Sequence, residues 1–161
     1  MASWAEFESS AAEFADAGRR LLVGADGVAI AFLATVSSHG RPHLAPVCPI
    51  FCAGRLYLSV GARTPKRRDL ADPGSYVLHA FLGENDEEFQ LAGRAREVGD
   101  ERERAAVHQA IPFPAFQAED PIFELDIERC LWCWWENVGQ PDTRPARRRW
   151  RADASHSAGP A

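Results

Sequence analysis

Short strand-like segments separated by turns limit most strongly how this chain can fold. Residues 28–36 are apolar on both faces, as in a central strand, and a turn at 37–40 leads into residues 41–51. Three prolines in residues 41–51 remove backbone donors and predict an edge strand, a bulge or a face open to a ligand. Further strands are predicted at residues 56–60, 75–82, 87–98, 123–127 and 131–136, with Gly93 suited to a sharp bend. Short strands, hairpin turns and few helices predict a mainly β (α+β) fold, a small antiparallel β-barrel.

A few helices flank these strands. Ser3 and Glu6 form a capping box, and apolar residues at helical spacing predict a helix over residues 4–22. A second helix is predicted from Thr64, a good N-cap residue that is followed by proline at the first helical position. A third helix is predicted over residues 100–110, which open with a second capping pattern.

Length and composition indicate one domain. A chain of 161 residues with 46% hydrophobic and 25% charged residues is typical of a globular protein with a single core. From Gly139 onward the composition shifts to Pro, Arg, Asp, Ser and Ala. We therefore expect the folded domain to cover residues 1–151 and residues 152–161 to form a disordered tail.

The charge and the hydropathy exclude several classes of function. A formal net charge of -5 argues against nucleic-acid binding and against adhesion to anionic membranes. The first residues are acidic and lack an apolar signal core, and no run approaches the roughly 20 apolar residues of a membrane helix. We expect a cytoplasmic protein.

The four cysteines are expected to be reduced thiols rather than metal ligands. Cys48 and Cys52 lie in an apolar strand-like run, and Cys130 and Cys133 lie in another. Zinc sites place such pairs on turns, so no metal site is predicted. A cytoplasmic location also disfavours disulfides.

The stretch from Gly61 to Leu70 is the first candidate binding site. A strand ends before it, a helix begins at Thr64, and Lys66, Arg67 and Arg68 add positive charge at that end. Lys66 is the only lysine beside seventeen arginines. These residues suit a phosphate group, although a capped surface helix with a solvated basic face explains them too.

The order of the elements resembles one known family. The segments Ala31-Phe-Leu-Ala-Thr-Val, Gly40-Arg-Pro-His-Leu-Ala-Pro-Val, Leu56-Tyr-Leu-Ser and Thr64-Pro-Lys-Arg-Arg-Asp-Leu follow one another as in the pyridoxamine 5′-phosphate oxidase-like proteins. The resemblance covers about residues 4–151. It implies the split β-barrel fold, built as a homodimer with two cofactors at the subunit interface.

The resemblance also implies the cofactor and its contacts. The cofactor would be FMN or the deazaflavin F420, with haem less expected, and the substrate a small molecule. Matched residue by residue, Thr64, Lys66 and Arg68 would hold the cofactor phosphate. The residues that would lie along the flavin ring are Pro46, Val47, Ser59 and Val60.

One departure bears on activity. True pyridoxamine 5′-phosphate oxidases carry an Arg-Leu-His-Asp-Arg type segment near the end, where this chain has Arg147-Arg-Arg-Trp-Arg. The vitamin B6 reaction is therefore not expected. Two functions remain open: an FMN- or F420-dependent oxidoreductase whose catalytic residues the sequence does not name, and a non-enzymatic protein that binds flavin, F420 or haem.

Two histidines and three tryptophans are secondary candidates. His43 and His79 lie on strands, where either packing or a ligand contact explains them, and packing is favoured. Trp135 is predicted to lie in the core. Trp132 and Trp134 face the other way and are predicted to be exposed at an interface.

The basic segment 144–151 has three possible roles. It could bind nucleic acid, it could hold an anionic cofactor tail of the partner subunit, or it could be a solvated tail. The solvated tail is favoured, and Arg147 to Arg149 are not expected to form a nucleic-acid site.

Overall fold

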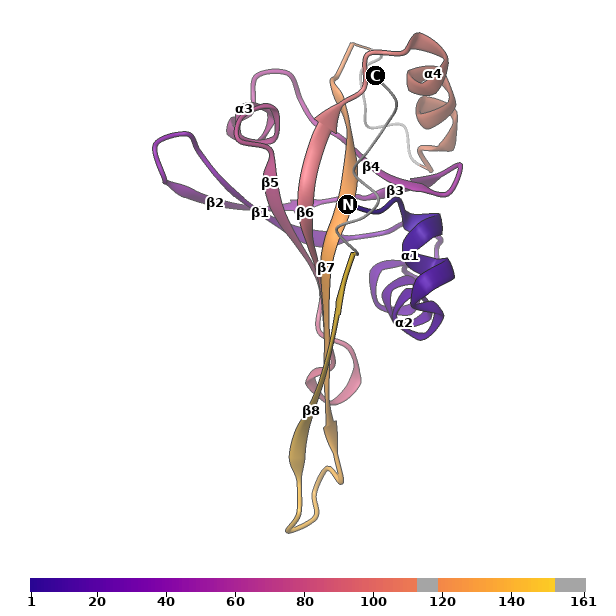
Figure 1. Cartoon of the computed structure of the whole chain (residues 1–161), viewed down its shortest axis with the longest axis vertical. Coiled ribbons are helices and arrows are strands. Elements are labelled where there is room, and N and C mark those ends of the chain that lie inside the picture. Colours follow the sequence, from indigo (N-terminus) through magenta and orange to yellow (C-terminus); the bar gives the residue numbers. More distant parts are fainter. Residues whose placement is uncertain (113–118, 153–161) are drawn as a thin grey trace.

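The computed structural model describes residues 1–112 and 119–152, and these form one curled antiparallel sheet flanked by helices (Figure 1). The strand order is β2-β1-β5-β6-β7-β4-β3, with β8 paired to β7. The strands are β1 (Ala31–Val36), β2 (Pro42–Val47), β3 (Ile50–Cys52), β4 (Arg55–Ser59), β5 (Ser75–Ala80), β6 (Glu88–Glu97), β7 (Ile122–Glu136) and β8 (Arg144–Arg151). The helices are α1 (Trp4–Ser10), α2 (Ala12–Leu22), α3 (Pro65–Ala71) and α4 (Glu101–Ala110), with a 3₁₀ turn η1 (Glu84–Asp86). The predicted α+β fold is confirmed, and the curled half-barrel sheet is consistent with the predicted split β-barrel. Residues 113–118 and almost all of the predicted tail lie outside the described residues.

The predicted helix over residues 4–22 is wrong in one respect, because the chain breaks at Ala11. That residue has φ -151° and ψ 58°, which are not helical angles, and it separates α1 from α2. The predicted capping box of Ser3 and Glu6 is present at the start of α1. The break lets both helices place their apolar sides on the sheet, so that Trp4, Phe7 and Phe14 enter the main core.

The predicted second strand over residues 41–51 is two strands. β2 pairs with β1 at one end of the sheet, whereas β3 pairs with β4 at the other end. Pro49 lies between them and lacks the N–H that a continuous ladder needs. The edge position predicted from the prolines is confirmed for β2.

Gly93 lies at the sharp bend predicted for it. The register between β6 and β7 shifts between Ala92 and Gly93, as at a β-bulge. A Cβ atom on residue 93 would lie 1.9 Å from the carbonyl oxygen of Asp126. Only glycine therefore permits the two strands to approach this closely.

β7 and β8 form a ribbon that the sequence did not predict. The two strands predicted at 123–127 and 131–136 are one continuous strand, and the predicted solvated tail over residues 144–151 is wrong. β8 pairs with β7 from Arg129↔Arg151 to Glu136↔Arg144, and the ribbon extends well below the body of the molecule (Figure 1). Alternate residues of β8 face α1 and α2. Trp150 packs edge-on against Phe7, and Arg148 pairs with Glu13.

Candidate functional site

A groove lies between the β1–β2 turn and α3. Its volume is about 680 Å³, within the usual range of ligand pockets. The groove is lined by Ser37, Ser38, His39, Arg41, His43, Pro65, Arg67, Arg68, Asp69, Ala71 and Asp72. Three of these side chains are arginines, so the groove is suited to an anion.

A buried carboxylate organises one wall of this groove. Asp69 of α3 is 3% exposed, and its Oδ2 atom accepts a hydrogen bond of 2.7 Å from the hydroxyl of Thr35 on β1. The same oxygen lies 2.7 Å from Nδ1 of His43 on β2. Thr35 and His43 are direct cross-strand partners, so the sheet itself brings the two residues under α3. This contact fixes the ring of His43, whose side chain is 40% exposed and lines the groove.

The arginines of the groove are poorly satisfied within the described residues. Arg41 and Arg68 have no ion pair there. Arg67 has one partner, Glu97, at 3.6 Å, and its Nε atom is buried without a hydrogen bond.

The sequence predicted a packing role for His43 and did not predict Arg41 and Asp69 as site residues. The predicted turn at 37–40 was the available signal, because it places Thr35 opposite His43.

The structure places Arg68 apart from the other two residues predicted for the cofactor phosphate, Thr64 and Lys66. Thr64 occupies the N-cap position, but the predicted side-chain cap is absent, because its hydroxyl donates to the Gly61 carbonyl at 2.9 Å. Arg68 lines the groove, whereas Lys66 does not. Two residues apart on a helix, their side chains project about 200° from one another. Lys66 is half-buried and has no ion pair within the described residues.

The four residues predicted along the flavin ring differ in exposure. Pro46 is exposed, whereas Val47 and Val60 belong to the main core. Ser59 is 7% exposed, and its hydroxyl has no hydrogen-bond partner among the described residues. An exposed proline, and a lysine and a hydroxyl that have no partner among the described residues, fit an anionic cofactor with a flat ring.

The sheet has a second, apolar side, which we call the outer face. It consists of Phe32, Val36, Leu44, Pro46, Val77 and Phe81. Leu44 is 70% exposed and Phe81 is 45% exposed, and the ring of Phe81 lies 4.6 Å from that of Phe32. Apolar side chains gathered in this way are typical of an interaction surface.

The predicted exposure of the tryptophans of β7 is wrong: the residue predicted to be buried is exposed, and Trp132, predicted to be exposed, packs on the core. Trp135, predicted to be core, is 43% exposed. Trp132 packs on the main core beside Phe14, donates to Glu87 at 2.7 Å and stacks against Trp134. The physical reason is α2, which covers the Trp132 side of the strand.

His79 forms a hydrogen bond between its Nδ1 atom and the carbonyl oxygen of Ala80, in agreement with a packing role.

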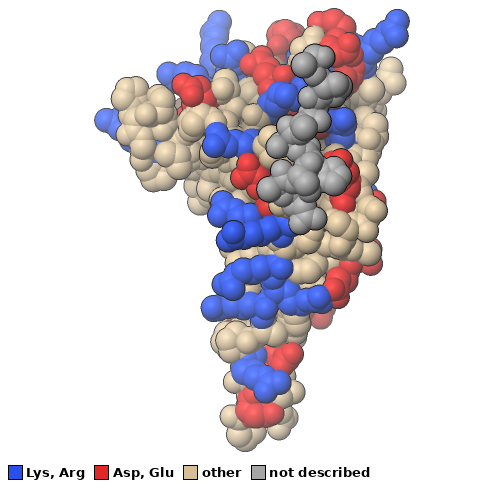
Figure 2. All heavy atoms as spheres, in the orientation of Figure 1, with Lys and Arg blue, Asp and Glu red and all other residues tan. Residues whose placement is uncertain are grey.

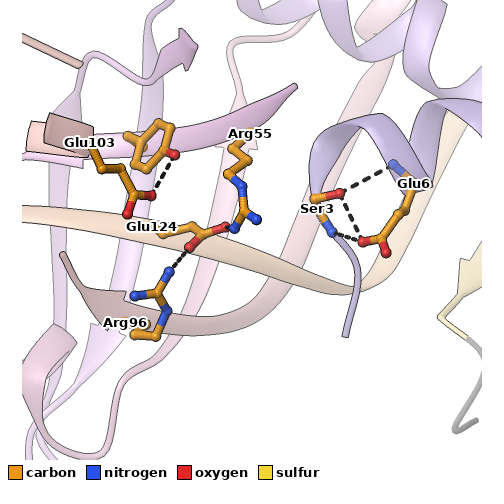
Figure 3. A network of polar contacts seen from close by, with 7 residues as sticks. Ser3, Glu6, Arg55, Arg96, Glu103 and Glu124 are labelled. Atoms are coloured by element: carbon orange, nitrogen blue, oxygen red, sulfur yellow. Dashed lines mark hydrogen bonds and ion pairs between the residues drawn. The ribbon is translucent and has the colours of Figure 1, made fainter. Parts of the chain in front are cut away.

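A charged network lies at a different opening of the barrel, near α4. Glu124 of β7 accepts from Arg55 and Arg96, one on each carboxylate oxygen (Figure 3). Nearby, the hydroxyl of Tyr57 donates to Glu103 at 2.8 Å. Burial raises the pKa of Tyr57, and the Glu103 carboxylate raises it further, so the hydroxyl stays protonated. The adjoining pocket has a volume of about 270 Å³.

Among the described residues, the cysteines and the arginines of β8 give no further candidate for a functional site. All four cysteines are free, and burial raises the pKa of Cys48 and Cys130, which makes these thiols poor nucleophiles. Within residues 1–112 and 119–152, no group of three or more potential metal ligands is found, and no helix is long and apolar enough to span a membrane. Arginines of β8 form basic bands across the ribbon (Figure 2).

Comparisons with known proteins identify the fold. No protein-family model matches the chain, and no curated protein is significantly similar to it. Among solved structures, an FMN-binding protein related to pyridoxamine 5′-phosphate oxidase, from Nostoc punctiforme, is 15% identical with a TM-score of 0.60, covering 91% of this chain and 96% of that one. A Clostridium acetobutylicum protein related to general stress protein 26, of the pyridoxinephosphate oxidase family, is 12% identical with a TM-score of 0.59, covering 90% and 94%.

A third similar structure is a haem-binding protein from Mycobacterium smegmatis. It is 22% identical with a TM-score of 0.53, and the match covers 74% of this chain. The match spans only 52%, about half, of that protein's own length. These similarities agree with the curled sheet and its element order. The chain therefore has the split β-barrel fold of the pyridoxamine 5′-phosphate oxidase-like proteins.

Proposed function

We propose that this protein is a cytoplasmic homodimer that binds FMN or F420 and acts as an oxidoreductase on a small substrate. The observation that carries the proposal is the split barrel, which matches an FMN-binding protein over 91% of the chain. The four free cysteines suit a reducing compartment. A bound flavin or deazaflavin would accept or donate a hydride, and the protein would orient it and exclude water.

Lys66 is the residue proposed to carry most of the cofactor phosphate binding. Its ammonium group has no ion pair within the described residues, so it is available to an anion. The Thr64 hydroxyl can accept a bond while it donates to Gly61. Arg68 would join the same phosphate only by bending its long side chain around α3.

The strand residues would border the ring in two ways. Pro46 offers an exposed apolar side chain, whereas Val47 and Val60 are buried and would border the ring through their backbones. Ser59 would supply its unpaired hydroxyl to a polar atom of the cofactor.

The outer face is the proposed dimer interface. A second copy seated there would remove Leu44 and Phe81 from water. Each buried apolar Å² contributes about 25 cal/mol, and stable dimers bury large apolar areas. The partner would also provide a second wall beside Pro46, which one chain leaves open.

Replacing Lys66 tests the cofactor site. A hydrogen bond to a charged group contributes about 1.5–3 kcal/mol, so Lys66→Ala should weaken the binding of FMN or F420 roughly ten- to a hundredfold. Fluorescence titration of both cofactors into wild type and variant measures this. Arg102→Ala, which removes an exposed cation of α4, is the control and should leave the affinity unchanged. Equal affinity in wild type and Lys66→Ala would refute the assignment of Lys66.

A non-enzymatic cofactor-binding protein is the second candidate. The similarity to a haem-binding protein at 22% identity favours it. Reduction and reoxidation of the bound cofactor distinguish the two functions. The oxidoreductase proposal expects a bound flavin or deazaflavin to bleach with a hydride donor and to recover when an acceptor is added. Binding of haem alone would support the second candidate.

A further inference from the structure

We propose that the groove between the β1–β2 turn and α3 is a second binding site for a phosphate monoester or inorganic phosphate, and that it shares only Arg68 with the residues predicted to hold the cofactor. Neither Thr64 nor Lys66 lines this groove. The inference therefore does not depend on the proposed cofactor.

The cationic lining specifies the charge of the ligand. Arg41 comes from the β1–β2 turn, and Arg67 and Arg68 come from α3, so arginines face the groove from both walls. Within the described residues Arg41 and Arg68 have no carboxylate partner, and Arg67 has a buried Nε without a hydrogen bond. Guanidinium groups bind phosphate through paired N–H donors, so a phosphoryl group satisfies this unused capacity.

The acidic residues of the groove do not cancel this preference. Asp69 is buried and its Oδ2 atom is already bonded to Thr35 and His43. Asp72 is the C-cap residue, at the opposite end of α3 from Pro65. Neither carboxylate forms an ion pair with Arg41 or Arg68 within the described residues.

His43 completes the site as a donor in its cationic form, because its Nδ1–H is already engaged by Asp69 and only the imidazolium carries a second N–H on Nε2. Its side chain is 40% exposed, and its Nδ1 atom is held by Asp69 at 2.7 Å. A carboxylate in this position fixes the orientation of the ring, as it does for other functional histidines. Because Nδ1 is occupied by Asp69, Nε2 is the ring nitrogen that remains for a ligand, and His43 lines the groove together with the arginines. Ser37 and Ser38 of the β1–β2 turn also line the groove, and the Ser37 hydroxyl accepts a hydrogen bond of 3.0 Å from the backbone N–H of Arg41.

Isothermal titration calorimetry tests the proposal: inorganic phosphate is titrated first into the full chain and then into the full chain saturated with FMN. On the chain saturated with FMN we expect one saturable phosphate site per chain. Arg41→Ala and Arg68→Ala should each weaken binding roughly ten- to a hundredfold, and His43→Gln about two- to tenfold. Arg102→Ala, which removes an exposed cation of α4 far from the groove lining, is the control and should bind phosphate as wild type does. Thermal unfolding verifies that each variant is folded.

Three results would overturn the inference. The first is no saturable phosphate binding to the wild type. The second is loss of binding in Lys66→Ala but not in Arg41→Ala, which would place the phosphate at the cofactor residues. The third is loss of phosphate binding once FMN is bound, which would make the groove part of the cofactor site. A chain that binds phosphate but no flavin would refute only the proposed function.

Discussion

Glu124 is the residue whose charge the fold has to compensate most completely. It lies on β7 with 1% of its surface exposed, and a buried unpaired carboxylate costs several kcal/mol. Arg55 on β4 and Arg96 on β6 flank it from the two neighbouring strands, one on each carboxylate oxygen (Figure 3). The two guanidinium groups are themselves about half exposed, with side chains 46% and 54% accessible. Each of them is therefore a weak contributor while the other remains.

Removing both arginines should cost far more than the sum of the single changes. Arg55→Met or Arg96→Met leaves Glu124 one partner and should lower the free energy of unfolding by up to about 1 kcal/mol. The double variant leaves the carboxylate uncompensated and should lose about 3–5 kcal/mol. Urea unfolding of the four proteins measures this coupling. Adding Glu124→Met to the double variant should restore much of the loss, and purely additive small losses would contradict the argument.

Single residues were only partly predictable from the sequence. Ser3 with Glu6 and the bend at Gly93 follow from local rules, and the structure bears out both. The pairing of His43 with Asp69 was not predicted, because it joins β2 to α3 across 26 residues. The capping role of Thr64 was predicted wrongly, since its hydroxyl found the Gly61 carbonyl instead.

At the scale of elements, β6 and β7 carry the curvature of the sheet. Their register shifts at the bulge beside Gly93, where the two backbones approach closely. A bulge bends a strand and increases its twist, which lets a flat sheet curl into a half-barrel. The fold therefore depends on the absence of a side chain at this one position.

Gly93→Ala should destabilise the protein strongly. The added Cβ atom would lie 1.9 Å from the Asp126 carbonyl oxygen, so backbone has to move. Overpacking costs about 1–3 kcal/mol and more where backbone blocks the space. Gly99→Ala is the matched control, because its Cβ atom meets nothing within 4 Å and should change stability by about 1 kcal/mol or less. Denaturant unfolding measures the free energy of unfolding of both variants. Equal stability of the two would contradict the proposed role of Gly93 at the bulge.

The elements that the sequence misjudged depend on tertiary contacts. β8 was expected to be a solvated tail because its composition is basic, yet Arg148 pairs with Glu13 and Trp150 packs on Phe7. Those contacts come from helices more than 130 residues away, as the Glu13 pair shows with a separation of 135 residues. The break between α1 and α2 likewise serves packing on the sheet rather than local helix propensity.

At the scale of the whole molecule, the outer face and the β7–β8 ribbon both expose apolar side chains that a single chain does not cover. Leu44 is 70% exposed at the edge strand, and Phe81 and Val36 are 45% and 43% exposed nearby. The β7–β8 ribbon reaches away from the body with Trp135 exposed on it (Figure 1). Both features leave apolar surface in water in a single chain, which is why we propose a homodimer with the cofactor between its chains.

Native mass spectrometry of the full-length protein, incubated with FMN or with F420 and then desalted, tests this account most directly. It reports the number of chains and of bound cofactors in one measurement. The account predicts a particle of two chains that retains two molecules of FMN or of F420. A particle of one chain, or a dimer that retains neither cofactor, would contradict it.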